Sequence, residues 1–151
     1  IPQPFWTRLL YIKRRPQAEG NKSRKMTIRH HVIGYENFLN FFENFQSNES
    51  IFVLYTGTKL ENGKSWCPDC VEAEPFIEAG LQVLTETSHF VVVEVGDRAF
   101  WKDPNCIFRK DNKTQLKVLP TLAKWGTQKR LQGSECQSEE LLNMLFTEKD
   151  D

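Results

Sequence analysis

The sequence predicts one α/β domain in which helices flank a central, mixed β-sheet. Short apolar runs of strand length alternate with longer segments of helical periodicity between residues 27 and 146. Strands joined through helices pair in parallel by right-handed crossovers, so the early strands should be parallel. The last two apolar runs are joined by a turn at Gly126, which predicts a closing hairpin. At 151 residues, the chain is long enough for one sizeable core but short for two.

The domain is predicted to begin with a strand, a helix and a second strand. Residues 27–33 contain spaced apolar residues and are expected to form an edge strand. Over residues 35–45, aromatic and aliphatic side chains recur at three- and four-residue steps. This predicts an amphipathic helix that ends near residues 47–48. Residues 51–55 form a continuous apolar run, which is typical of a central strand buried on both faces.

A polar loop over residues 56–65 then leads to Cys67 and a long helix. Pro75 is expected to kink this helix, because proline removes one backbone donor and clashes with the preceding turn. The apolar residues that keep helical spacing along it are Ala73, Phe76, Ile77, Gly80, Leu81 and Leu84.

The second half continues the alternation. Residues 90–95 are rich in β-branched side chains and predict a buried strand. Residues 96–105 are expected to be a loop, and residues 106–110 one helical turn. Residues 122–125 predict a third strand, followed by a fourth near residues 130–131. Ser138 is expected to cap a final helix with Glu139 and Glu140 in its first turn and a stripe of Leu141, Leu142, Leu145 and Phe146.

Residues 1–25 differ in charge from the remainder. They carry seven Lys and Arg against the single acid Glu19, a net +6, whereas the whole chain is neutral. Such a step predicts a basic N-terminal extension over residues 1–25, expected to be disordered, joined to a domain over residues 26–151. A translated segment upstream of a start at Met26 fits the same interpretation, and the alternatives are an Arg-rich transit peptide or a basic membrane- or partner-binding arm.

Composition narrows the function classes. Zero net charge gives no reason to expect nucleic-acid binding, and no apolar run approaches the roughly 18 residues of a membrane span. No secretory signal is visible. Four cysteines in a reducing compartment indicate redox chemistry or metal binding, and two of them form a C-x-x-C motif.

That motif is Cys67-Pro68-Asp69-Cys70. A disulfide-exchange catalyst needs one accessible, easily ionised thiol and a second thiol that resolves the mixed disulfide. At a helix start, the sulfur of Cys67 can accept from the backbone N–H of Cys70, and the positive helix end favours a thiolate. Pro68 suits the first helical position. Cys70 lies one turn on and is expected to face inward.

Two neighbours are predicted to tune this pair. Trp66 provides a flat apolar surface beside the reactive sulfur. Asp69 favours helix initiation but its charge opposes thiolate formation, so we predict only that Cys67 ionises more readily than a free thiol. Zinc is an alternative for a C-x-x-C motif, but Cys106, Cys136 and the histidines supply no second close pair of ligands, so no metal is predicted. A purely structural disulfide across so short a loop is also disfavoured.

Trp66 to Cys70 after a buried strand, Pro75 in the helix and Leu119-Pro120-Thr121 resemble the thioredoxin superfamily. Within it, the chain resembles the family of thioredoxin domain-containing protein 17 over roughly residues 27–149. The motifs that carry this closer resemblance are Lys64 to Cys70, Ala73-Glu74-Pro75, Phe100 to Asn105, Phe108-Arg109-Lys110 and Glu135-Cys136.

The resemblance implies a thioredoxin-like fold and a cytoplasmic, monomeric protein-disulfide reductase. Cys67 would be the nucleophile and Cys70 the resolving thiol, with no bound cofactor. Thioredoxin reductase would be the partner that supplies electrons from NADPH, and the substrates would be disulfide-containing proteins or small molecules such as cystine. Leu119 and Pro120, the latter with a cis peptide bond, would bind the substrate. Peroxide-linked activity and a role in tumour-necrosis-factor and NF-κB signalling are also implied.

The sequence departs from the superfamily pattern in places. Residues 52–56 offer no buried acid as a proton relay, a role that Asp69 can take instead. Cys106 stands where the family is expected to have Asn and is interpreted as a bystander, as is Cys136. Residues 56–65 and 97–110 are predicted to narrow access to the dithiol. A redox-inactive thioredoxin-fold adaptor that binds a signalling partner is the alternative function.

Overall fold

The computed structural model describes residues 26–148, and the predicted extension over residues 1–25 lies outside them. The described residues form a five-stranded sheet in the order β1–β3–β2–β4–β5. The strands are β1 (Thr27–Ile33), β2 (Ser50–Thr56), β3 (Ser88–Glu94), β4 (Thr121–Lys124) and β5 (Arg130–Gln132). Strand β3 pairs in parallel with β1 and β2, whereas β4 runs antiparallel to β2 and β5. The predicted mixed sheet, its edge strand and its central strand are confirmed.

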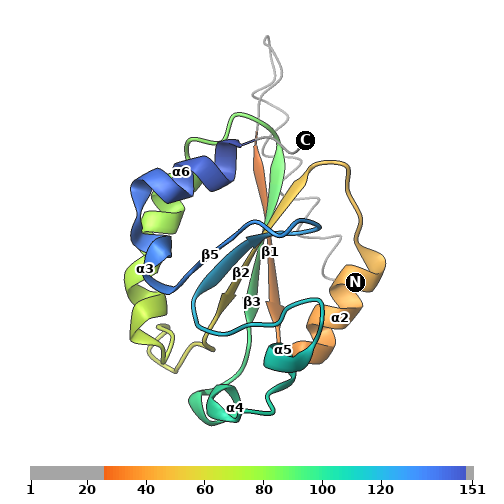
Figure 1. The fold of residues 1–151 in the computed structure, drawn as a ribbon, viewed down its shortest axis with the longest axis vertical. Helices are drawn as coiled ribbons and strands as arrows, with labels where there is room; N and C mark the ends of the chain where they lie inside the picture. The colour runs from red at the N-terminus through yellow and green to blue at the C-terminus, as the bar shows by residue number, and fades with distance from the viewer. Residues whose placement is uncertain (1–25, 149–151) are drawn as a thin grey trace.

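Helices cover both faces of this sheet (Figure 1). Helix α3 (Pro68–Leu81) and helix α6 (Glu139–Thr147) lie together on one side, and α2 (Tyr35–Asn44) lies on the other. Short helices α4 (Arg98–Lys102) and α5 (Ile107–Lys110) follow β3, and a 3-10 helix, η2 (Gly133–Gln137), precedes α6. None of the helices between residues 26 and 148 has both the length and the apolar character needed to cross a bilayer.

Each central strand contributes to two separate cores, because successive side chains of a strand point to opposite faces. Strand β2 sends Val53 and Tyr55 to one face and Phe52 and Leu54 to the other. We call the first cluster, which includes Phe38 of α2, the α2-side core. We call the second, which includes residues of α3 and α6, the α3–α6-side core. Cys67 and Cys70 belong to the α2-side core.

Several predicted boundaries are corrected. Helix α2 ends at Asn44, because Phe45 is already extended. The predicted loop over residues 96–105 contains α4, which begins where Asp97 Oδ1 accepts from the N–H of Phe100 at 2.9 Å. Five residues are too few for apolar periodicity to reveal a helix. The 3-10 helix η2 was not predicted either.

Helix α3 also differs from its predicted apolar face. It ends at Leu81, so Leu84 lies beyond it. Its buried line is Ala73, Ile77 and Leu81, at strict four-residue steps, whereas Phe76 is 43% exposed. Phe76 sits on the flank of the stripe, where the helix faces α6 across a gap. The predicted capping of α6 is confirmed, since Ser138 Oγ accepts from the N–H of Leu141 at 3.2 Å.

Candidate functional site: a disulfide at the start of a helix

Helix α3 begins at the C-x-x-C motif. Cys67 is its N-cap, and its Sγ accepts from the backbone N–H of Cys70 at 3.2 Å. Pro68 occupies the first helical position, where no backbone donor is lost. The two sulfurs form a disulfide, with Cα atoms 5.2 Å apart. The sulfur of Cys67 therefore lies at the positive end of the helix, which stabilises negative charge there.

The two cysteines are less exposed than their place at a helix start suggests. Cys67 is 5% exposed and Cys70 is 6% exposed. The expectation that Cys70 faces inward is confirmed, but the expectation of an accessible Cys67 is wrong for this disulfide form. Pro68 and Asp69, between them, are exposed. In this disulfide form, both cysteines are therefore largely shielded from solvent.

Trp66 is held in place from two sides. Its indole Nε1 donates to the carbonyl of Gly96 at 2.8 Å, and its backbone N–H donates to the carbonyl of Thr58 at 3.3 Å. A Cβ on Gly57 would lie 2.7 Å from the indole ring, so the ring occupies space that only a glycine leaves free. Trp66 packs against the α2-side core, to which Cys67 and Cys70 also belong.

Similar contacts fasten the first segment predicted to narrow access, residues 56–65, to Gly96, which directly precedes the second segment, residues 97–110. The N–H of Thr58 donates to the carbonyl of Gly96, and the N–H of Gly96 donates to Thr58 Oγ1, both at 3.0 Å. Lys59 and Ser65 form an isolated antiparallel bridge that closes the loop on itself. Ser65 Oγ then accepts from the N–H of Cys67 at 3.1 Å. The loop is thus a fastened structure that leads directly into the motif.

Glu94, which the sequence analysis did not select, organises this loop. It is 4% exposed at the end of β3, and its Oε1 accepts from the N–H of Lys59 at 3.4 Å. Its Oε2 lies 2.7 Å from His31 Nε2. A carboxylate is rarely buried without partners. An acid directly after a run of β-branched residues could have indicated such a role. In the sequence analysis, Glu94 was instead counted as part of a buried strand.

Leu119 and Pro120 are buried and precede β4. The Leu119–Pro120 peptide bond is cis, as the resemblance implied. Leu119 belongs to the same core cluster as Cys67 and Cys70. The structure therefore places Leu119, one of the two predicted substrate-binding residues, in the core that holds the disulfide.

A small cavity of about 50 Å³ lies on the α3 side of Cys70. It is large enough for a water molecule. Its polar lining residues include Thr56, Ser65, Glu74 and Glu78. No acid lies on β2 itself, as the sequence indicated, but acids of α3 reach this cavity.

Cys106 and Cys136 are free thiols and both are buried. Cys136 is fully buried in the α3–α6-side core, and its Sγ donates to the carbonyl of Leu131 at 3.6 Å. Burial raises the pKa of Cys136 to about 12. Cys106 lies in the α2-side core. Between residues 26 and 148, no group of three or more His, Cys, Asp or Glu side chains is arranged to hold a metal ion.

Comparison with known proteins agrees with this geometry. The family model for the thioredoxin domain of thioredoxin domain-containing protein 17-like proteins matches residues 31–148. Thioredoxin domain-containing protein 17 of Homo sapiens is 44% identical over 117 residues, which is 78% of this chain and 93% of that protein. The Danio rerio protein of the same name is 45% identical over the same shares. Thioredoxin-like protein Clot of Arabidopsis thaliana is 41% identical over 83 residues, 55% of this chain and 62% of that protein.

The sheet order, the disulfide at the start of α3 and these matches lead to one assignment. The chain belongs to the thioredoxin domain-containing protein 17-like family of thioredoxin domains.

Proposed function

We propose that the protein is a thiol–disulfide oxidoreductase that reduces disulfide bonds through Cys67 and Cys70. The observation that carries the proposal is the sulfur of Cys67 at the N-terminus of α3, bonded to a second sulfur one turn deeper. Family membership supports a redox function for this pair.

The reaction follows from the two positions. In the reduced protein, the Cys67 thiolate attacks one sulfur of a substrate disulfide, and the other substrate sulfur leaves as a thiolate. Cys70 then loses its proton and attacks the Cys67 sulfur of the mixed disulfide, which releases the second substrate thiolate. The product is the Cys67–Cys70 disulfide seen here. The cavity beside Cys70 offers its proton a route to the carboxylates of α3.

The cycle needs two electrons to reopen the disulfide. We assign them to thioredoxin reductase and NADPH in the cytoplasm, so the protein itself binds no cofactor. Substrates are disulfide-containing proteins or small disulfides such as cystine, which Leu119 and Pro120 hold against the dithiol. The same two electrons would reduce a peroxide to an alcohol and water. A role in tumour-necrosis-factor signalling would follow from reduction of a signalling protein.

The burial of Cys67 supports a selective reductase. Cys67 is 5% exposed and its N–H donates to Ser65 of the fastened loop over residues 57–65, so a large folded substrate must displace neighbouring residues or present an exposed disulfide. Cystine should therefore be reduced much faster than insulin. Rapid insulin reduction would contradict this selectivity while leaving the reductase activity itself intact.

The decisive experiment measures NADPH consumption with thioredoxin reductase and cystine. Wild type should turn over, and both Cys67→Ser and Cys70→Ser should lose turnover. Cys136→Ser is the matched control and should retain it, since Cys136 lies in the other core. If Cys67→Ser kept full activity, the redox proposal would fail and the adaptor function would be favoured.

A further inference from the structure

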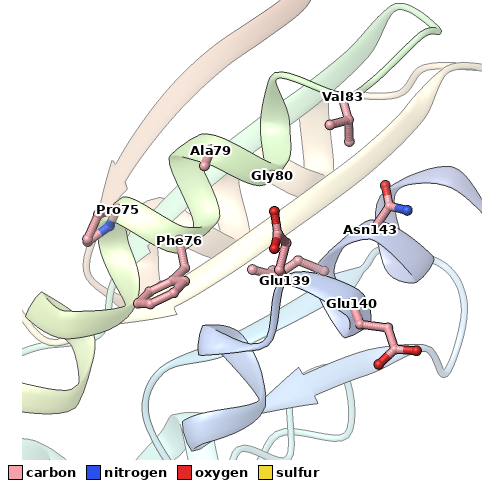
Figure 2. Close-up of a pocket in the computed structure, with 9 residues that line it drawn as sticks. Pro75, Phe76, Ala79, Gly80, Val83, Glu139, Glu140 and Asn143 are labelled. Carbon is pink, nitrogen blue, oxygen red and sulfur yellow. The ribbon is translucent and has the colours of Figure 1, made fainter.

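An open groove lies between α3 and α6 (Figure 2). These two helices lie on the side of the sheet away from α2 (Figure 1). Its volume is about 850 Å³, within the roughly 300–1,000 Å³ typical of ligand-binding clefts. The wall formed by α3 and the residues just after it is apolar, and Phe76 and Val83 are 43% and 44% exposed there. The floor includes Leu142 of α6. Such a concentration of exposed apolar surface indicates a binding site.

The opposite wall is acidic. Among the described residues that line the groove, only Glu139 and Glu140 carry charge. Both are exposed at the start of α6. A partner for this groove therefore needs apolar side chains next to positive charge.

The chain itself contains such a segment. Residues 5–12 include Phe5-Trp6 and Leu9-Leu10-Tyr11-Ile12, with Arg8 between them. Lys13, Arg14 and Arg15 follow directly. We propose that residues 5–15 bind in the groove between α3 and α6 of the same molecule, with their apolar side chains against Phe76 and Val83 and their positive charges beside Glu139 and Glu140.

The connection is short enough. The carbonyl of Met26, where the described chain begins, accepts from the N–H of Ser88 at 3.1 Å. Val83 lines the groove, and Ser88 follows it by five residues. The Cα atoms of these two residues are therefore at most about 18 Å apart. Residues 16–25 alone can span roughly 35 Å when extended. Residues 16–25 are therefore long enough for residues 5–15 to reach the groove, and tethering gives that segment an effective concentration of about 1 mM there.

Charge also favours this segment over a second copy of the chain as the occupant of the groove. A symmetric dimer through this face would set the same surface against itself. Each copy would bring the carboxylates of Glu139 and Glu140 into the interface, with no lysine or arginine among the described lining residues to offset them. The basic segment meets the same surface with opposite charge.

Photo-crosslinking of the full chain tests the proposal. The photoreactive residue is introduced as Leu9→p-benzoylphenylalanine, the purified protein is irradiated, and the products are mapped by mass spectrometry. The expected product has the mass of one chain, with its cross-links on residues 76–83 or 139–143. Ala79→Arg places a positive charge on the exposed apolar wall and should lower the yield about tenfold, the effect of displacing roughly one buried apolar side chain.

Ile33→Arg is the matched control, because Ile33 is exposed on β1 and does not line the groove. It should leave the cross-linking yield unchanged. A product of twice the mass would assign the groove to another copy of the chain and overturn the proposal. Cross-links that map elsewhere, or a yield insensitive to Ala79→Arg, would overturn it as well. None of these three results bears on the proposed redox function, which is measured separately by NADPH consumption.

Discussion

The two faces of the sheet are packed by different chemistry. On the α2 side, Phe38 is fully buried, and its ring lies 5.3–6.0 Å from those of Phe42, Tyr55, Phe108 and Trp125. On the α3–α6 side, the core is mainly aliphatic, with one aromatic pair, Phe52 and Phe146, among the ring contacts found in residues 26–148. The aromatic core encloses the disulfide, whereas the aliphatic core borders an open groove. The aromatic face therefore carries the disulfide of the proposed redox function, and the aliphatic face carries the groove.

The largest expected difference between the faces is in stability. Phe38→Ala removes the ring at the centre of the aromatic cluster and should lower the free energy of unfolding by about 3–5 kcal/mol. Phe76→Ala, on the open face, should change it by about 0.5 kcal/mol or less. Urea unfolding followed by circular dichroism measures both. Equal losses would show that the groove side is packed as tightly as the aromatic side.

The buried thiol of the α3–α6-side core should be chemically inert. Because burial raises the pKa of Cys136 to about 12, almost none of it is thiolate at pH 8. Iodoacetamide should modify Cys136 at least about a hundredfold more slowly in the native protein than in urea. Mass spectrometry of the labelled peptide gives both rates. Rapid native labelling would mean that this core opens readily.

Gly57 connects the aromatic face to the disulfide through Trp66. Gly57→Ala places a Cβ 2.7 Å from the indole ring, so the ring must move, at a cost of about 1–3 kcal/mol. Cystine turnover should fall with it. Gly80→Ala is the control on the other face, where a helix-propensity gain of about 1 kcal/mol offsets a 3.0 Å contact with Phe146. If Gly57→Ala left turnover unchanged, Trp66 would have no positioning role.

The α2 side should also respond to acid. Burial, with the neighbouring His89, lowers the pKa of His30 to about 4 from an ordinary 6.5. Between pH 6.5 and 4, the unfolded chain binds a proton that folded His30 does not, so this contribution to stability falls as the pH falls and is constant below about pH 4. In His30→Gln, the melting temperature should therefore fall less between pH 6.5 and pH 4 than it does in the wild type. An identical pH profile in the variant would contradict this.

The smallest effect is expected at the surface pair of Arg29 and Glu78 on the α3 side. Two hydrogen bonds of 2.8 and 2.9 Å join them, but both side chains are nearly half exposed. Glu78→Gln should cost only about 0.5 kcal/mol, and high salt should reduce the difference. A loss above about 2 kcal/mol would show that the pair is shielded from solvent in solution.

Periodicity predicted the long elements because they bury whole stripes or runs of side chains. The position of the C-x-x-C motif at the start of a helix was predictable because capping depends on local spacing. The features that the sequence did not predict depend on contacts between distant residues or lie in short segments. Phe76 has the spacing of a core residue but is 43% exposed, because α6 does not cover it. The position of α6 relative to α3 cannot be predicted from the periodicity of either helix. Glu94 is a loop organiser because Lys59 and His31 meet it from elsewhere in the chain.

The capping role of Cys67 makes serine an unusually clean replacement. The sulfur that would attack a substrate is also the acceptor that satisfies a backbone donor at the first turn of α3. A serine hydroxyl performs that second task well, so Cys67→Ser removes the nucleophile and keeps the helix start intact. Alanine would remove both and add a folding defect of about 1 kcal/mol. The same sulfur atom has a proposed role in the reaction and a role in capping α3. Only a substitution that keeps the cap, such as Cys67→Ser, therefore tests the reaction alone.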